Sequence, residues 1–195
     1  ALNNLLKRLD PVSFIEHTKI SQEHNGNQVT RQEYELLHCL QVSRDPETDS
    51  LAEFIANHFK VETRYLKDEE TGSDITQTVT RQMLNLPTIL AIGVTRLFND
   101  DPKPIRVPLK LDMARFITTS NTRFALCAGI IYMGNRLQGH FVAVVRKGNQ
   151  WFCINDLIVK SVSEYDALRL LSSFSMVFYE QEETEDPFGG GDDDY

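Results

Sequence analysis

The sequence predicts an α+β fold that is mainly antiparallel sheet with a few helices. Three observations support this. Six strand-like runs follow one another from Leu86 onward, two segments have clear helical periodicity, and two polar segments carry Asn-Gly and Thr-Gly turn signals between strand-like runs. A chain of 195 residues, 41% of them hydrophobic, is long enough to bury one real core.

The first third of the chain predicts helices and hairpins. Leu2, Leu5, Leu6 and Leu9 fall on one face of an opening helix. Residues 49–59 form the clearest helix, with Ser50 and Glu53 as a capping box and a buried stripe at Leu51, Phe54, Ile55 and Phe59. His58 lies beside that stripe, so we expect a packed histidine there. The polar segments 21–30 and 66–80 are expected to be hairpin tips or loops.

The remainder predicts a sheet with one more helix. The expected strands are LPTILAIGV, IRVPLKL, FALCAGIIYM, HFVAVV, WFCIN and SMVFYE, with a helix over SEYDALRLL before the last of them.

The net charge of −8 comes from one end of the chain. Residues 180–195 hold eight Asp and Glu and no Lys or Arg, and without them the chain has 20 basic and 20 acidic residues. The segment is expected to be disordered, either as a solvated terminus or as a docking segment for a basic partner. The basic residues are scattered, so no nucleic-acid surface is expected. No apolar run is long enough to span a bilayer and no signal peptide is apparent, which favours an intracellular protein, cytoplasmic or nuclear.

The three cysteines, Cys39, Cys127 and Cys153, lie in apolar, strand-like segments and show no paired spacing. Neither a disulfide framework nor a zinc site is indicated, and all three are expected to be small buried side chains.

A histidine and an asparagine are brought together by the predicted hairpin of HFVAVVR and WFCIN across KGNQ. In that register Asn155 lies opposite Val142, two positions from His140 on the same face, and such diagonal neighbours can touch. A histidine held by an amide is part of a Cys-His-Asn site of the papain-like kind. A slip of one residue would separate the two side chains, and spacing alone favours a structural histidine beside a turn.

The order of motifs resembles the C-terminal half of the ubiquitin-specific proteases, over roughly residues 30–180. The matching segments are LPTIL, TRLF, IRVPLKLDM, the "His box" FALCAGIIYMGNRLQGHFVAVV, WFCINDLIV and MVFYE. The resemblance implies a papain-like catalytic-domain portion over residues 1–179, with a palm and fingers, followed by the acidic tail 180–195. It implies as partners ubiquitin or a ubiquitin-like modifier and a ubiquitinated protein substrate.

The resemblance also implies roles for particular residues. His140 would be the general base, Asn155 would orient its ring, and Asp156 would help to polarise the site. Loops 98–105 and 133–138 would close over the extended ubiquitin tail. The residues implied to bind that tail are Phe98, Gly134, Gly139, Phe141 and Trp151.

Several departures limit the resemblance. Phe141 replaces a tyrosine, and Thr-Arg-Leu-Phe has one extra residue. The family's two Cys-x-x-Cys pairs should fall near residues 18–24 and 65–72, where TKISQEH and YLKDEET stand instead. We therefore expect zinc-free fingers, no metal site and no cofactor.

The family's Cys box has no counterpart in the chain. Pairing across the predicted hairpins places Cys127 near Val145, on the order of 15 Å from His140, and Cys153 near Val144. Two functions stay open: the ubiquitin-binding part of a deubiquitinase whose cysteine lies on a separate segment or chain, or a catalytically inactive ubiquitin-binding or scaffold module. A structural domain with an accidental His-Asn pair is a third reading. The order of His140, Asn155 and Asp156 favours the first.

Overall fold

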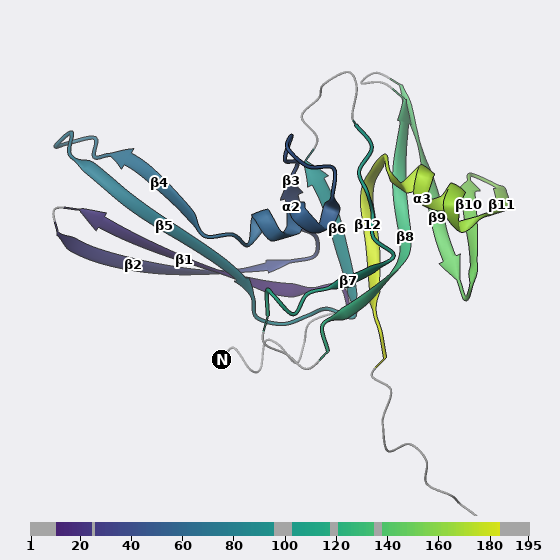
Figure 1. Cartoon of the computed structure of the whole chain (residues 1–195), viewed down its shortest axis with the longest axis horizontal. Coiled ribbons are helices and arrows are strands. Elements are labelled where there is room, and N and C mark those ends of the chain that lie inside the picture. The colour runs from purple at the N-terminus through teal and green to yellow at the C-terminus, as the bar shows by residue number, and fades with distance from the viewer. Residues whose placement is uncertain (1–10, 25, 96–102, 118–120, 135–137, 184–195) are drawn as a thin grey trace, which may run out of the picture.

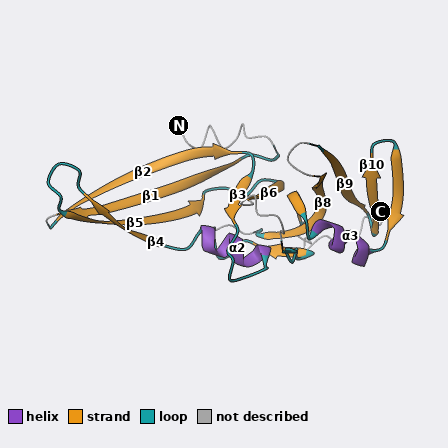
Figure 2. Ribbon diagram, turned by 90° about the horizontal axis from the view of Figure 1, so that it is seen from above, coloured by secondary structure: helices purple, strands orange, loops and turns teal. Residues whose placement is uncertain are grey.

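The computed structural model describes residues 11–24, 26–95, 103–117, 121–134 and 138–183, and it contains two sheets (Figure 1). The finger sheet has the order β2-β1-β5-β4, and the palm sheet has the order β11-β10-β9-β8-β12-β6-β3, with β7 paired to β8. The finger strands project as a long arm from the palm in both views (Figures 1 and 2). The α+β fold with a predominantly antiparallel sheet is therefore confirmed.

The finger sheet consists of two antiparallel hairpins joined by β1 and β5. Its strands are β1 (Phe14–His24), β2 (Asn27–Leu37), β4 (Glu62–Lys67) and β5 (Asp74–Met83). The predicted polar segments 21–30 and 66–80 run into and out of the two turns at the far end of the arm, so the hairpin-tip interpretation is confirmed. Long polar strands suit this arm because few of its side chains are buried.

The palm sheet is formed by the segments after Leu86, with one strand contributed from earlier in the chain. Its strands are β3 (Leu40–Ser43), β6 (Ile89–Thr95), β7 (Lys110–Asp112), β8 (Arg123–Gly134), β9 (Gly139–Lys147), β10 (Gln150–Asn155), β11 (Ile158–Val162) and β12 (Phe174–Gln181). β3 pairs with β6 in parallel, and the other pairings are antiparallel.

Two expectations about strands need correction. Residues 105–111 were expected to form one strand, but only Lys110–Asp112 does. Pro108 has no N–H for a ladder, and the Ile105 and Arg106 N–H groups donate to Ser172 O and Asp49 O instead. Edge strand β11 was not predicted, because its residues are mostly exposed and lack an apolar alternation.

Helices α2 (Leu51–His58) and α3 (Glu164–Leu171) lie where the periodicity predicted them. The predicted capping box at Ser50 is wrong. The Ser50 side chain caps no backbone N–H of α2, and the Ser50 backbone N–H donates to Thr48 Oγ1 rather than to the Glu53 side chain. At α3, by contrast, Ser163 Oγ accepts from the Asp166 N–H at 3.0 Å.

The hydrophobic core lies between the palm sheet and both helices. Leu51, Phe54 and Ile55 of α2 are fully buried, as the stripe predicted, whereas Phe59 is half-buried. Central strand β12 contributes Phe174, Val177 and Tyr179, and the Tyr179 hydroxyl donates to Pro108 O at 2.7 Å. His58 is packed as expected, with Nε2 2.7 Å from the Glu16 carboxylate. The predicted opening helix and residues 184–195 of the acidic tail lie outside the described residues.

Candidate active site

The β8–β9 hairpin places His140 at the start of strand β9, beside the hairpin turn. His140 shares its face of β9 with Val142 and Val144, which are 3% and 0% exposed. The backbone that follows the histidine is therefore held by the core, while the histidine side chain lies at the end of the strand and is 42% exposed. A base that must meet a substrate needs both conditions.

The register predicted for β9 and β10 is confirmed, and it brings His140 and Asn155 together. Ile154 pairs with Ala143, so Asn155 follows opposite Val142, and the turn between the strands is only Gly148-Asn149. His140 Nε2 lies 2.6 Å from Asn155 Oδ1. The two side chains thus meet from neighbouring strands, as the diagonal relation required.

This hydrogen bond fixes which ring nitrogen can act as a base. Asn155 Oδ1 can only accept, so Nε2 of His140 carries the hydrogen and donates it. In the neutral ring Nδ1 is then the acceptor, and it has no partner among the described residues. The arrangement leaves Nδ1 available to take a proton.

Asp156 lies beside the pair in the Asp156-Leu157 turn between β10 and β11. Its φ of 51° is left-handed, a conformation that aspartate tolerates better than most residues. Its carboxylate lies 3.8 Å from His140 Nε2 and its side chain is 77% exposed. The unpredicted strand β11 therefore sets this carboxylate in place, at the distance of a screened ion pair rather than of a hydrogen bond.

Two of the predicted tail-binding residues sit directly beside the histidine. Gly134 and Gly139 pair with each other across β8 and β9. Gly134 has a φ of 144°, and a Cβ on it would overlap the backbone of Gln138 and Gly139. A Cβ on Gly139 would overlap the ring of Tyr132. A side chain at Gly134 would collide with backbone, and one at Gly139 would need the Tyr132 ring to move, so both positions favour glycine.

The other predicted tail-binding residues are dispersed. Phe141 is 61% exposed on the face of β9 opposite His140, against Tyr132 at 5.1 Å between ring centroids. Trp151 is 2% exposed and opposite Arg146, at the end of β10 away from Asn155, so the structure does not bring it to His140. Phe98 lies outside the described residues, as do most of loop 98–105 and the middle of loop 133–138.

The three cysteines lie away from His140. Cys153 pairs with Val144 as expected, while Cys127 lies one residue beyond the Ala128–Val145 pair, and so one residue farther from His140 than predicted. Cys127 is therefore about 20 Å from His140 along the strands, at roughly 3.3 Å per residue. All three thiols are half-buried rather than buried. Burial raises the pKa of Cys39 and of Cys127, which disfavours the reactive thiolate in both.

The fingertips carry a hydrogen-bonded cluster where the family resemblance implied zinc. His24 Nε2 lies 2.7 Å from Ser73 Oγ and so joins the β1–β2 tip to the β4–β5 tip. Ser73 also meets Thr71, whose backbone N–H and hydroxyl donate to Asp68 Oδ1 at 2.7 and 2.8 Å. Among the described residues there is no group of three or more His, Cys, Asp or Glu side chains that could hold a metal ion.

A family profile described as ubiquitin carboxyl-terminal hydrolase matches residues 2–179, nearly the whole chain. The chain belongs to the ubiquitin carboxyl-terminal hydrolase family. The ubiquitin-specific protease resemblance is thereby confirmed, and the match includes His140, Asn155 and Asp156. Comparison with curated proteins gave no match.

Solved structures support the same fold for this hydrolase-family chain. A chain of the Ubp8-Sgf11-Sgf73-Sus1 SAGA DUB module has a TM-score of 0.73 and 21% identity. A yeast SAGA DUB module with an Sgf73 variant has a TM-score of 0.72 and 20% identity, and a SAGA DUB module bound to monoubiquitin has 0.68 and 20%. Each likeness covers 89% of this chain, but only 40% to 42% of the matched chain.

The chain thus spans well under half the length of the structures it resembles. In the part of the chain that the structure describes, no helix has the length and apolar character needed to cross a bilayer.

Proposed function

We propose that this chain is the ubiquitin-binding portion of a deubiquitinating cysteine protease, and that it supplies the histidine and asparagine of the catalytic triad. The nucleophilic cysteine lies outside residues 1–195. The observation that carries this proposal is the 2.6 Å contact between His140 Nε2 and Asn155 Oδ1. This contact leaves Nδ1 as the proton acceptor at the exposed end of strand β9. Family membership supports the assignment of a hydrolase to that geometry.

The proposed chemistry follows the roles of these atoms. His140 Nδ1 takes the proton of the cysteine thiol, and the thiolate attacks the carbonyl carbon at the ubiquitin C-terminus. As the tetrahedral intermediate collapses, the carbon–nitrogen bond breaks and the amine leaves with the proton from His140. Water, deprotonated by the same ring, then hydrolyses the thioester. Asn155 holds the ring through both steps, and Asp156, whose carboxylate lies 3.8 Å from Nε2, helps to polarise the site.

Gly134 and Gly139 support the proposed binding of a narrow tail. A substituent at either position would collide with atoms of the hairpin itself, so the glycines let β8 and β9 approach closely next to His140. A ubiquitin tail that ends in two glycines is the proposed neighbour of this narrow turn. Phe98 and Phe141 are the other proposed contacts of the same tail, which belongs to ubiquitin or a ubiquitin-like modifier.

A second function is favoured by one specific observation. Among the three cysteines, none lies near His140, and the two with a raised pKa are poor nucleophiles. An inactive ubiquitin-binding or scaffold module would have no need of a thiol. Under this alternative His140 and Asn155 only shape the hairpin turn.

A covalent ubiquitin probe separates the two functions. The probe carries a thiol-reactive group at its C-terminus and is applied to this chain and to the longest natural product of its gene. We expect no covalent labelling of the 195-residue chain, and labelling of the longer protein at one cysteine outside it. Labelling of neither, with retained ubiquitin binding, would establish the scaffold function.

Turnover gives an independent check on the distances. The isolated chain should not hydrolyse a ubiquitin C-terminal amide, because His140 has no nucleophile to activate. Robust hydrolysis that is lost in Cys127→Ala would contradict the separation deduced from the strand register. Tyr165→Ala, an exposed change on α3, is the matched control.

A further inference from the structure

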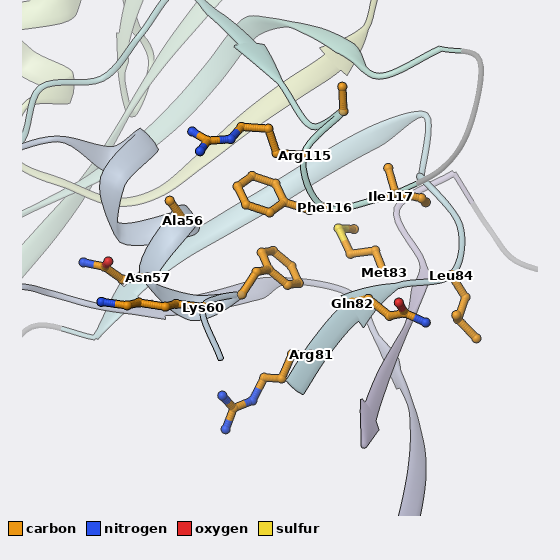
Figure 3. A pocket seen from close by; sticks show the side chains of 12 residues that line it. Ala56, Asn57, Lys60, Arg81, Gln82, Met83, Leu84, Arg115, Phe116 and Ile117 are labelled. Carbon is orange, nitrogen blue, oxygen red and sulfur yellow. The ribbon is translucent and has the colours of Figure 1, made fainter. Parts of the chain in front are cut away.

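A basic pocket lies where the finger sheet joins the palm, at a distance from the His140 site. It is formed by the end of α2, the end of β5 and the segment after β7, and it has a volume of about 740 Å³. Phe59, Met83 and Phe116 form its apolar floor, and Lys60, Arg81 and Arg115 surround it. Figure 3 shows Phe116 and Met83 near the centre, with the three cationic side chains around them.

The floor of the basic pocket is rigid and aromatic. Phe59 and Phe116 stack with 4.8 Å between ring centroids and an angle of 26° between planes. Met83, which also lines the pocket, is 2% exposed and belongs to the core. Stacked rings beside a thioether make a surface that accepts a flat apolar side chain.

The charge of the basic pocket is not balanced locally. No carboxylate lines it. Arg81 has one acidic neighbour, Glu62 at 3.5 Å, and Glu62 also binds Arg64 at 2.6 Å. Lys60 and Arg115 are exposed and form no ion pair with a carboxylate of the described residues. Three cations around an apolar floor fit an acidic peptide that carries an aromatic residue.

The chain itself contains such a peptide. Residues 184–195, TEDPFGGGDDDY, hold five carboxylates and no basic residue, with Phe188 two positions after Asp186. This segment accounts for most of the charge imbalance of the protein. Its composition is therefore complementary to the basic pocket in both charge and aromatic content.

The start of this segment is close to the basic pocket. The Glu182 N–H donates to Arg123 O, and Asn121 Nδ2 donates to Glu182 O at 2.7 Å. The Met113 N–H donates to Thr122 O, and the pocket residues Arg115 and Phe116 lie two and three residues after Met113. The last described residues thus lie about two strand spacings, roughly 10 Å, from Met113, and the chain runs from Met113 into the pocket. Twelve extended residues span about 40 Å.

We propose that the basic pocket binds the acidic segment 184–195 of the same chain. Tethering makes the effective concentration of the segment on the order of millimolar, so a modest affinity suffices. Because Met83 ends a finger strand and Phe116 follows a palm strand, the bound segment bridges the two sheets. The proposal does not depend on catalysis.

Zero-length cross-linking of the intact chain tests this. A carbodiimide joins a lysine amine to a carboxylate only when the two are in contact, and peptide mass spectrometry locates the bond. We expect Lys60 to be linked to carboxylates of 184–195 at least about tenfold more than the exposed Lys147 and Lys160, which corresponds to a preference of roughly 1.4 kcal/mol. The yield should not change on dilution and should fall with added salt.

Variants sharpen the assignment. Arg115→Glu and Phe188→Ala should each lower the Lys60 yield, whereas the control Lys160→Glu should not. Equal linkage of the segment to all exposed lysines would overturn the proposal. A yield that falls on dilution would also overturn it, by assigning the pocket to the segment of a second copy. An unrelated peptide of equal charge is then added as a competitor. If it abolishes the cross-link between Lys60 and the segment, the pocket binds acidic peptides in general.

Discussion

The palm site at the end of β9 and the fingertip each contain a histidine in a short hydrogen bond, but the two bonds differ in the structure that supports them. His140 and Asn155 are 15 residues apart and sit on adjacent strands above the buried Val142 and Val144. His24 and Ser73 are 49 residues apart and join two hairpin tips far from the core. The His140–Asn155 hydrogen bond is thus fixed by strands packed on the core, whereas the His24–Ser73 hydrogen bond only links two hairpin tips. The first suits proton transfer, and the second suits mechanical linkage.

The largest expected effect comes from His140→Ala in the complete enzyme. In the proposed function His140 is the general base, and without it the cysteine thiol stays mostly protonated at neutral pH, since an ordinary cysteine has a pKa of about 8.5. We expect kcat to fall roughly 10²- to 10⁴-fold, with ubiquitin binding retained because the contact surface is large compared with one side chain. His24→Ala is the matched change at the fingertip and should leave kcat unaltered. If His140→Ala keeps full turnover, the palm histidine is structural too.

Asn155→Ala should cost less than His140→Ala. In the proposed function Asn155 orients the ring without exchanging a proton, and a hydrogen bond to an ion is worth roughly 1.5–3 kcal/mol, or about 10- to 150-fold in rate. Steady-state kinetics should place the loss in kcat rather than in KM, because the Asn155 side chain acts through the ring of His140. Asn155→Asp, which keeps the acceptor, should recover part of the loss.

His24→Ala should loosen the fingertip without unfolding the palm. A hydrogen bond of this kind contributes about 0.5–1.5 kcal/mol, and its loss should raise amide exchange in residues 68–73 while β12 stays protected. Chelators should leave this exchange unchanged, and elemental analysis should find no stoichiometric zinc. One zinc per chain would show that the tips are assembled differently.

The smallest effect is a pH dependence confined to the same tip. The backbone N–H of Thr71, then its hydroxyl, lower the pKa of Asp68 by binding the charged carboxylate. A lowered pKa in the folded state stabilises the tip above the unfolded pKa and loses that contribution as the pH falls. Exchange in residues 68–73 should therefore increase below about pH 4. Asp68→Asn should remove this increase, and an unchanged acid response in that variant would assign it to another group.

Local pattern determined most of the palm and its site. Alternating strands joined by a short turn fix the register of β9 and β10, because both sides of the hairpin share one buried face. That register is why the contact of His140 with Asn155 could be deduced from spacing. The two helices followed from their apolar stripes for the same reason, since each stripe faces one core.

Only the tertiary structure decided the features that join distant segments. The Ser50 capping box was not formed because Thr48 takes its N–H and Arg106 pairs with Ser50 in a bridge. Strand β11 exists because β10 offers it an edge, although its own side chains are mostly exposed. The tie between His24 and Ser73, the pairing of Glu16 with His58 and the basic pocket each need two or more segments that lie far apart in sequence. Periodicity reports which face of an element is buried, and it carries no information on which other element meets that face.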